Sequence, residues 1–174
     1  MSRASRVVVV GAIAVALSAV TQAKGMTSRI VISGGNLSAP AEITDADVIR
    51  QFQIGAGPGT RSCFREECIE GTTGFIVDWP AGAVDAPRSD LPQYDVYFYV
   101  SNNLVVGHVG EEHLAYVVGY AYDHVTSQGY VYLPGKDDTW FRVNARSIFR
   151  GVEGHWFRGT RAWQEVVVPR ILHR

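Results

Sequence analysis

Cysteine and histidine are scarce in this sequence, which has two cysteines and five histidines among 174 residues. Structural zinc sites usually take four ligands, and two cysteines alone cannot supply them. The spacings typical of P-loops, dinucleotide-binding loops and zinc proteases are also absent. The sequence therefore predicts no metal and no cofactor, and it assigns no catalytic residue to any enzymatic activity.

Neither positive nor negative charge predominates. The chain has 16 basic and 17 acidic residues, and residues 1–23 hold two of the basic ones. The rest is therefore mildly acidic, although residues 142–174 hold seven arginines against only Glu153 and Glu165. Nucleic-acid-binding domains are normally basic overall. We therefore expect no nucleic-acid partner.

The sequence has one long apolar run, over residues 7–20, which follows two arginines and leads to small residues at Ala23. This order is typical of a secretory signal peptide. We predict a signal peptide over residues 1–23 and an exported domain, periplasmic or extracellular, over residues 24–174.

The alternative is that the apolar run stays in the chain as a membrane anchor. Fourteen residues are short for a membrane span, which needs about 20. Cleavage is therefore favoured, and no span is expected after it. The remaining 151 residues fit one globular domain.

Cys63 and Cys68 lie in the short polar segment "CFREEC". In an exported chain, two such cysteines favour a disulfide that closes a small loop. We therefore predict a Cys63–Cys68 disulfide.

Short runs rich in Val, Tyr, Phe and Ile, separated by turn residues, predict β-strands over most of the chain. One shows clear alternation, with Val96, Phe98 and Val100 opposite Asp95, Tyr97 and Tyr99. Short connections favour antiparallel neighbours. The predicted fold is α+β and strand-dominated: a curled antiparallel sheet, as a meander, sandwich or barrel, with one or two short helices. The runs are residues 29–35, 74–79, 94–100, 104–109, 114–122, 129–135 and 139–144.

Two segments have helical spacing. Over residues 45–53, Thr44 and Asp47 form a capping-box pattern before an apolar face. Over residues 160–168, Thr160 is a candidate cap and Pro169 a candidate terminator. The valines at 166–168 equally fit a strand.

The glycine-rich stretch "IGAGPGT" at residues 54–60 resembles a phosphate-binding loop only in composition. Such a loop must precede a helix, whose free N–H groups face the phosphate. This one follows a predicted helix and has the wrong spacing. It is therefore interpreted as a helix end and a loop.

"HVGEEH" is the most metal-like cluster, with His108, Glu111, Glu112 and His113 within six residues. It matches neither helical zinc pattern, and Gly107 and Gly110 argue against a helix. A solvated turn is the favoured interpretation, so no metal site is predicted.

"YLPGKDDTW" is the better candidate for a binding loop. Pro134 and Gly135 predict a turn, and loops that combine charges with aromatic rings often bind ligands. An ordinary polar turn is the alternative. The candidate ligand-binding residues are Tyr132, Lys136, Asp137, Asp138 and Trp140.

Three phrases, at residues 74–84, 129–144 and 151–163, resemble an uncharacterised family of exported bacterial proteins: "GFIVDWPAGAV", "GYVYLPGKDDTWFRVN" and "GVEGHWFRGTRAW". The resemblance implies export and one shared domain, and it carries over no functional residue. The function hypothesis is a non-catalytic envelope or extracellular module that binds a carbohydrate or a protein. The alternative is a hydrolase acting on an envelope or extracellular polymer.

Overall fold

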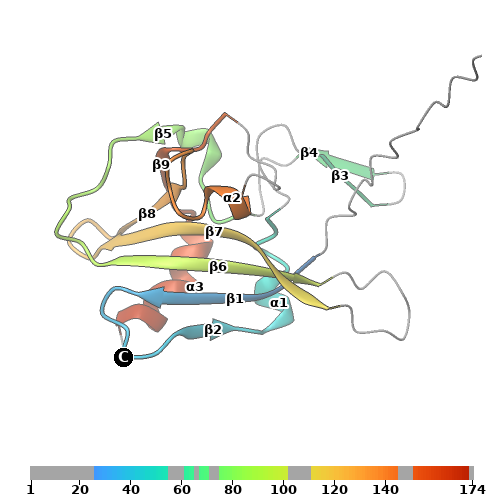
Figure 1. Ribbon diagram of the computed structural model, residues 1–174, viewed down its shortest axis with the longest axis horizontal. Coiled ribbons are helices and arrows are strands. Elements are labelled where there is room, and N and C mark those ends of the chain that lie inside the picture. Colours follow the sequence, from blue (N-terminus) through green and yellow to red (C-terminus); the bar gives the residue numbers. More distant parts are fainter. Residues whose placement is uncertain are drawn as a thin grey trace, which may run out of the picture.

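The computed structural model describes residues 26–54, 61–64, 67–70, 75–101, 111–144 and 151–172 (Figure 1). These residues form an open seven-stranded antiparallel sheet, a separate two-stranded sheet and three short helices. The predicted α+β, strand-dominated class is confirmed. No helix within the described ranges is long and apolar enough to cross a membrane.

The large sheet has the strand order β2-β1-β6-β7-β8-β9-β5. Four strands consecutive in the chain, β6 to β9, are neighbours in the sheet, so its centre is the expected meander. The first strand pairs with β6, and β5 pairs with β9. The strands are β1 (Met26–Gly34), β2 (Ala41–Ile43), β5 (Ala83–Val84), β6 (Gln93–Ser101), β7 (Glu112–Asp123), β8 (Gln128–Leu133) and β9 (His155–Arg158).

Alternating side chains give the sheet one core face. In β6, Val96, Phe98 and Val100 are buried, while Tyr97 and Tyr99 on the opposite face are half-buried. The predicted alternation is thus confirmed. Facing positions in neighbouring strands continue the core across the sheet: Ile30, Ile32, Tyr116, Val118, Tyr120, Val131, Leu133 and Phe157.

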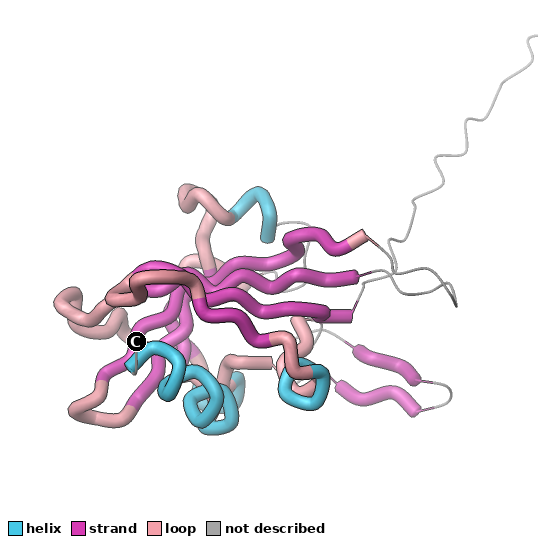
Figure 2. The backbone as a smooth tube through the Cα atoms, turned by 90° about the horizontal axis from the view of Figure 1, so that it is seen from below, coloured by secondary structure: helices cyan, strands magenta, loops and turns pink. Residues whose placement is uncertain are grey.

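Helices lie on both sides of the sheet (Figure 2). The helices α1 (Ala46–Ile49) and α3 (Arg161–Leu172) lie on one side, and α2 (Phe141–Asn144) lies on the other. In α3, Trp163, Val167 and Ile171 are buried at intervals of four residues, so one stripe of this helix belongs to the core. We call the side of the sheet that carries α2 the outer face.

For the C-terminal helix, the predicted cap is confirmed and the predicted terminator is not. The Thr160 hydroxyl oxygen accepts a hydrogen bond from the Trp163 backbone N–H at 3.2 Å, as expected of a cap. Pro169 as the terminator was wrong, because the helix continues through it to Leu172. Proline removes one helical hydrogen bond, but the buried contacts of Val167 and Ile171 continue on both sides of it.

The first helix is shorter than predicted and is capped differently. Asp45, and not Thr44, is the cap: its Oδ1 accepts hydrogen bonds from the backbone N–H groups of Asp47 and Val48 at 2.9 and 3.1 Å. The helix ends at Ile49, and single turns carry the chain on to the buried Phe52.

Two predicted strands were wrong. Residues 141–144 of the 139–144 run form α2. Among the described residues of the 74–79 run, which are 75–79, pairing with the sheet is limited to a Val77–Gly159 bridge, and the 3₁₀ helix η1 (Trp79–Ala81) begins at Trp79. Pro80 explains the early end, because proline has no N–H to donate to a ladder.

The two-stranded sheet contains both cysteines. It consists of β3 (Arg61–Phe64) and β4 (Glu67–Glu70), in which Cys63 and Cys68 are direct cross-strand partners. The predicted strand at 104–109, most of the glycine-rich stretch 54–60 and the predicted signal peptide lie outside the described residues.

Candidate binding surface

A row of outer-face residues crosses the middle of the large sheet. Asp95 in β6 pairs with Gly119 in β7, Gly119 with Tyr132 in β8, and Tyr132 with Trp156 in β9. All four alternate with core residues of the same strands and therefore face away from the core. Strand pairing thus brings a carboxylate and two aromatic rings to one surface.

Tyr132 and Trp156 form the first ring pair. Their centroids are 5.1 Å apart, with 36° between the ring planes. Gly119 allows this placement, because a Cβ atom there would lie only 3.1 Å from the Tyr132 Cβ and 3.7 Å from its ring. Tyr132 therefore lies close against β7, and both rings remain half-buried.

The loop after β8 holds Asp138 beside this pair. Its Oδ2 accepts hydrogen bonds from the Tyr132 hydroxyl at 2.7 Å and from the Gly135 backbone N–H at 2.6 Å. Burial is the main cause that raises the pKa of Tyr132, and the hydrogen bond to Asp138 raises it further. The Tyr132 hydroxyl is therefore a neutral donor that orients the carboxylate.

A second contact, with the segment just before β9, fixes the start of the same loop. The Gly154 backbone N–H donates to the Leu133 carbonyl oxygen at 2.7 Å. A Cβ atom at Gly135 would lie 2.9 Å from the Gly154 Cα, so the two backbones meet where no side chain fits. The candidate loop is therefore held by two contacts, one through Asp138 and one through Gly154.

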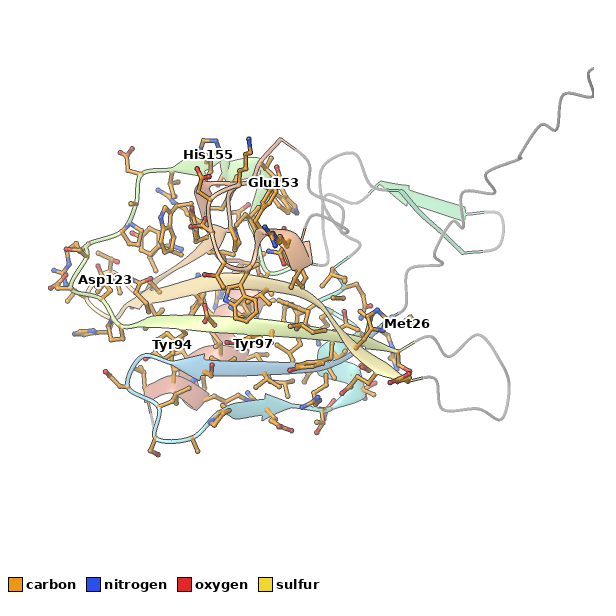
Figure 3. The ribbon with its side chains drawn as sticks, viewed as in Figure 1. Met26, Tyr94, Tyr97, Asp123, Glu153 and His155 are labelled. Atoms are coloured by element: carbon orange, nitrogen blue, oxygen red, sulfur yellow. The ribbon has the colours of Figure 1, made fainter. Side chains whose placement is uncertain are left out.

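Trp140 and Tyr97 form the second ring pair. Their centroids are 5.5 Å apart and the rings are nearly perpendicular, at 84°. The Tyr97 hydroxyl donates to Asp95 Oδ2 at 3.2 Å, and burial is the main cause that raises the Tyr97 pKa. Tyr97 lies near the middle of the sheet (Figure 3). The second pair thus also has a carboxylate beside it.

The buried side chain of Asn144 fixes α2, the helix that follows Trp140. Its Oδ1 accepts from the Val117 backbone N–H at 2.8 Å, and its Nδ2 donates to the Val117 carbonyl at 2.6 Å. The pairing of β7 with β8 ends at Gly119, so Val117 lies past the end of that ladder. The side-chain amide replaces the missing strand.

We call Tyr97, Tyr132, Trp140 and Trp156, with Asp95 and Asp138, the aromatic surface. Of the five predicted ligand-binding residues, Tyr132, Asp138 and Trp140 contribute to it through the contacts above. Lys136 and Asp137 are exposed on the adjoining turn.

Sequence reasoning missed Tyr97, Asp95 and Trp156 as site residues. Alternation did place Asp95 and Tyr97 together on the face opposite Val96 and Phe98. The missing information was strand order, which brings β6 and β9 to either side of the β7–β8 hairpin.

One residue of the metal-like cluster, Glu112, has a structural role. Glu112 is not in a turn: it begins β7, and its Oε2 lies 2.6 Å from Arg29 Nη2. The Arg29 guanidinium lies 4.1 Å from the centre of the Tyr99 ring. Glu111 and His113 are exposed, and His108 lies outside the described residues. Among the residues described, no group of three or more His, Cys, Asp and Glu is placed to hold a metal ion.

Comparisons of the chain with protein-family models, with curated proteins and with solved structures each gave no match. Its function therefore has to be inferred from the aromatic surface itself.

Proposed function

We propose that the protein is an exported, non-catalytic module that binds a carbohydrate on the aromatic surface. The observation that carries the proposal is that two ring pairs, each with its own carboxylate, share one face of the sheet. Sugars present apolar C–H faces and hydroxyl donors. Aromatic rings with a few oriented polar groups complement both.

The carboxylates are suited to accept hydrogen bonds from a ligand. Asp95 accepts one bond from Tyr97, and Asp138 accepts two on a single oxygen. An ionised carboxylate has about four acceptor positions, so both keep capacity for sugar hydroxyls. The bonds already present orient each group toward its neighbouring ring pair.

The rigidity of the surface also supports binding. The loop is held by Asp138 and by the Gly135–Gly154 contact, and α2 is held by Asn144. A surface that is already ordered loses less conformational freedom when a ligand binds. A smaller loss of conformational entropy on binding is important for the affinity of a weakly held ligand such as a sugar.

Export is the second part of the proposal. It is supported by the basic, apolar and small-residue order of residues 1–23. An exported protein meets envelope and extracellular polysaccharides, which are ligands of the proposed kind.

A glycan array tests the proposal. The purified protein should bind a set of saccharides, and Trp140→Ala and Trp156→Ala should each weaken binding about tenfold or more, as expected for central aromatic anchors. Tyr99→Ala is the matched control, because Tyr99 is a half-buried outer-face ring covered by Arg29. Thermal melting identifies variants that fail to fold. An array without any bound saccharide, or wild-type affinity in both tryptophan variants, would contradict the proposal.

A further inference from the structure

We infer that the ligand is a linear, neutral oligosaccharide that contacts both ring pairs at once. This inference rests on the proposed carbohydrate-binding function and adds the length and the charge of the ligand. Four features of the aromatic surface support it: the separation of the ring pairs, the repetition of one set of residue types, the small side-chain bulk at Gly119, and the charges beside the rings.

The tyrosines of the two ring pairs belong to strands that are not neighbours. Tyr97 is paired with Val117, whereas Tyr132 is paired with Gly119 on the other side of β7. The two tyrosines are thus two strands apart and offset by two residues. Strand geometry gives about 12 Å between their Cα atoms. A single pyranose ring cannot cover both pairs, whereas a short chain can.

The same set of residue types occurs twice. Trp140 and Tyr97 lie beside Asp95, which accepts from the Tyr97 hydroxyl. Trp156 and Tyr132 lie beside Asp138, which accepts from the Tyr132 hydroxyl. Each unit therefore combines a ring pair with one oriented carboxylate. Two like units on one face suit a ligand that repeats its own chemistry along its length.

The region between the pairs has little side-chain bulk. Gly119 lies between Asp95 and Tyr132 in the cross-strand row, and it has no side chain beyond its backbone. The Tyr132 side chain leans toward this glycine: a Cβ atom there would lie 3.1 Å from the Tyr132 Cβ and 3.7 Å from its ring. An extended chain can therefore run from one pair to the other across β7.

The charges beside the rings favour a neutral chain. Both ring pairs have an aspartate in hydrogen-bond contact with a ring hydroxyl. A polyanion would bring its own negative charges beside these two carboxylates, and like charges repel.

Calorimetric titration with chains of different length tests the inference. The probes are glucose, cellotriose and cellohexaose, and in parallel N-acetylglucosamine, chitotriose and chitohexaose. In at least one series, the hexamer should bind about tenfold or more tightly than the monomer, because the second contact becomes intramolecular. An oligogalacturonate of matched length should bind more weakly than the neutral hexamer.

Variants assign the length dependence to the two pairs. Trp156→Ala should remove most of the hexamer's advantage over the monomer, and Tyr99→Ala should leave it unchanged. Asp138→Asn is the second variant, to be used if Trp156→Ala fails to fold. It keeps an acceptor oxygen for the Gly135 N–H, and we expect it to lower the affinity for the hexamer.

Two groups of results would overturn the inference. Equal affinity for all lengths, or tighter binding of the oligogalacturonate, would overturn it and leave carbohydrate binding intact. Lack of binding to every probe, together with a blank glycan array, would overturn both.

Discussion

The side chain of Asn144 pairs with the backbone of Val117 as a neighbouring strand would. Oδ1 and Nδ2 together satisfy the Val117 N–H and carbonyl, at 2.8 and 2.6 Å. Both residues are buried. Because α2 begins one residue after Trp140, this pairing holds the base of the second ring pair as well as the edge of β7.

We expect Asn144→Leu to leave the Val117 backbone groups buried without these partners. Such groups cost about 1–3 kcal/mol each when unsatisfied. Urea unfolding should therefore show a clear loss of stability. If the protein still folds, saccharide affinity should fall too, because Trp140 is no longer held. Wild-type stability for this variant would contradict a structural role of the pairing.

Trp163 should be the most costly ring to truncate. It is fully buried and lies edge-on to Phe52, with centroids 5.2 Å apart. We expect Trp163→Ala to lower the free energy of unfolding by about 3–5 kcal/mol, as for other buried aromatic truncations. Trp156→Ala is the control. Compared with Trp163→Ala, it should lower the free energy of unfolding less and weaken saccharide binding more. Similar melting of Trp163→Ala and wild type would contradict the core assignment.

The Arg29–Glu112 pair predicts a dependence of stability on pH. The hydrogen bond from Arg29 is the main cause that lowers the Glu112 pKa. A pKa that is lower in the folded state means that the pair stabilises above the ordinary glutamate pKa of about 4.3. This contribution is lost as the pH falls through the folded pKa.

Glu112→Gln should therefore cost stability at neutral pH, by under about 1 kcal/mol because the pair is partly exposed. The difference from wild type should shrink toward about pH 3. Glu42→Gln is the matched control, since its contact with Arg29 is longer, at 3.4 Å, and more exposed. A difference that grows on acidification would contradict the role of the ion pair. Chemical denaturation at a series of pH values measures it.

The cysteine pairing predicts an intramolecular disulfide. Directly opposite residues in an antiparallel ladder have Cα atoms about 4.5 or 5.5 Å apart, and disulfides span both distances. Cys63 and Cys68 are opposite residues of this kind. Intact mass should therefore rise by about 2 Da on reduction. Alkylation of both thiols without reduction would show that the bond does not form.

Export predicts a new N-terminus. When the full chain is produced in a bacterial host, we expect the recovered protein outside the cytoplasm to begin at Lys24. N-terminal sequencing identifies this residue directly. An uncleaved chain that stays in the cytoplasm would contradict the signal peptide.

Long alternating segments could be predicted from the sequence, and short ones could not. In β6, residues 93–100 alternate between outer-face and core positions, so the sequence pattern directly indicates which side chains are buried. The run at 139–144 has too few residues to distinguish strand from helix. Its helical form accompanies the pairing of Asn144 with Val117, a contact 27 residues away in sequence.

Runs without alternation were also misleading. Phe75, Ile76 and Val77 are all buried, although they make only one bridge to the sheet. Their hydrophobicity reflects packing from several sides, and not a strand period. Similarly, the loop residues of the candidate site were predictable because turn chemistry is local, whereas Tyr97 and Trp156 depend on strand order.

The large sheet ends in very short strands at both borders. The border strand β2 has three residues and β5 has two. A bordering strand offers its unpaired backbone groups as a template on which another polypeptide can add, and a short one offers few. A second copy of this chain would therefore gain little by strand addition at these borders. Edge-to-edge aggregation through β2 or β5 should therefore be weak.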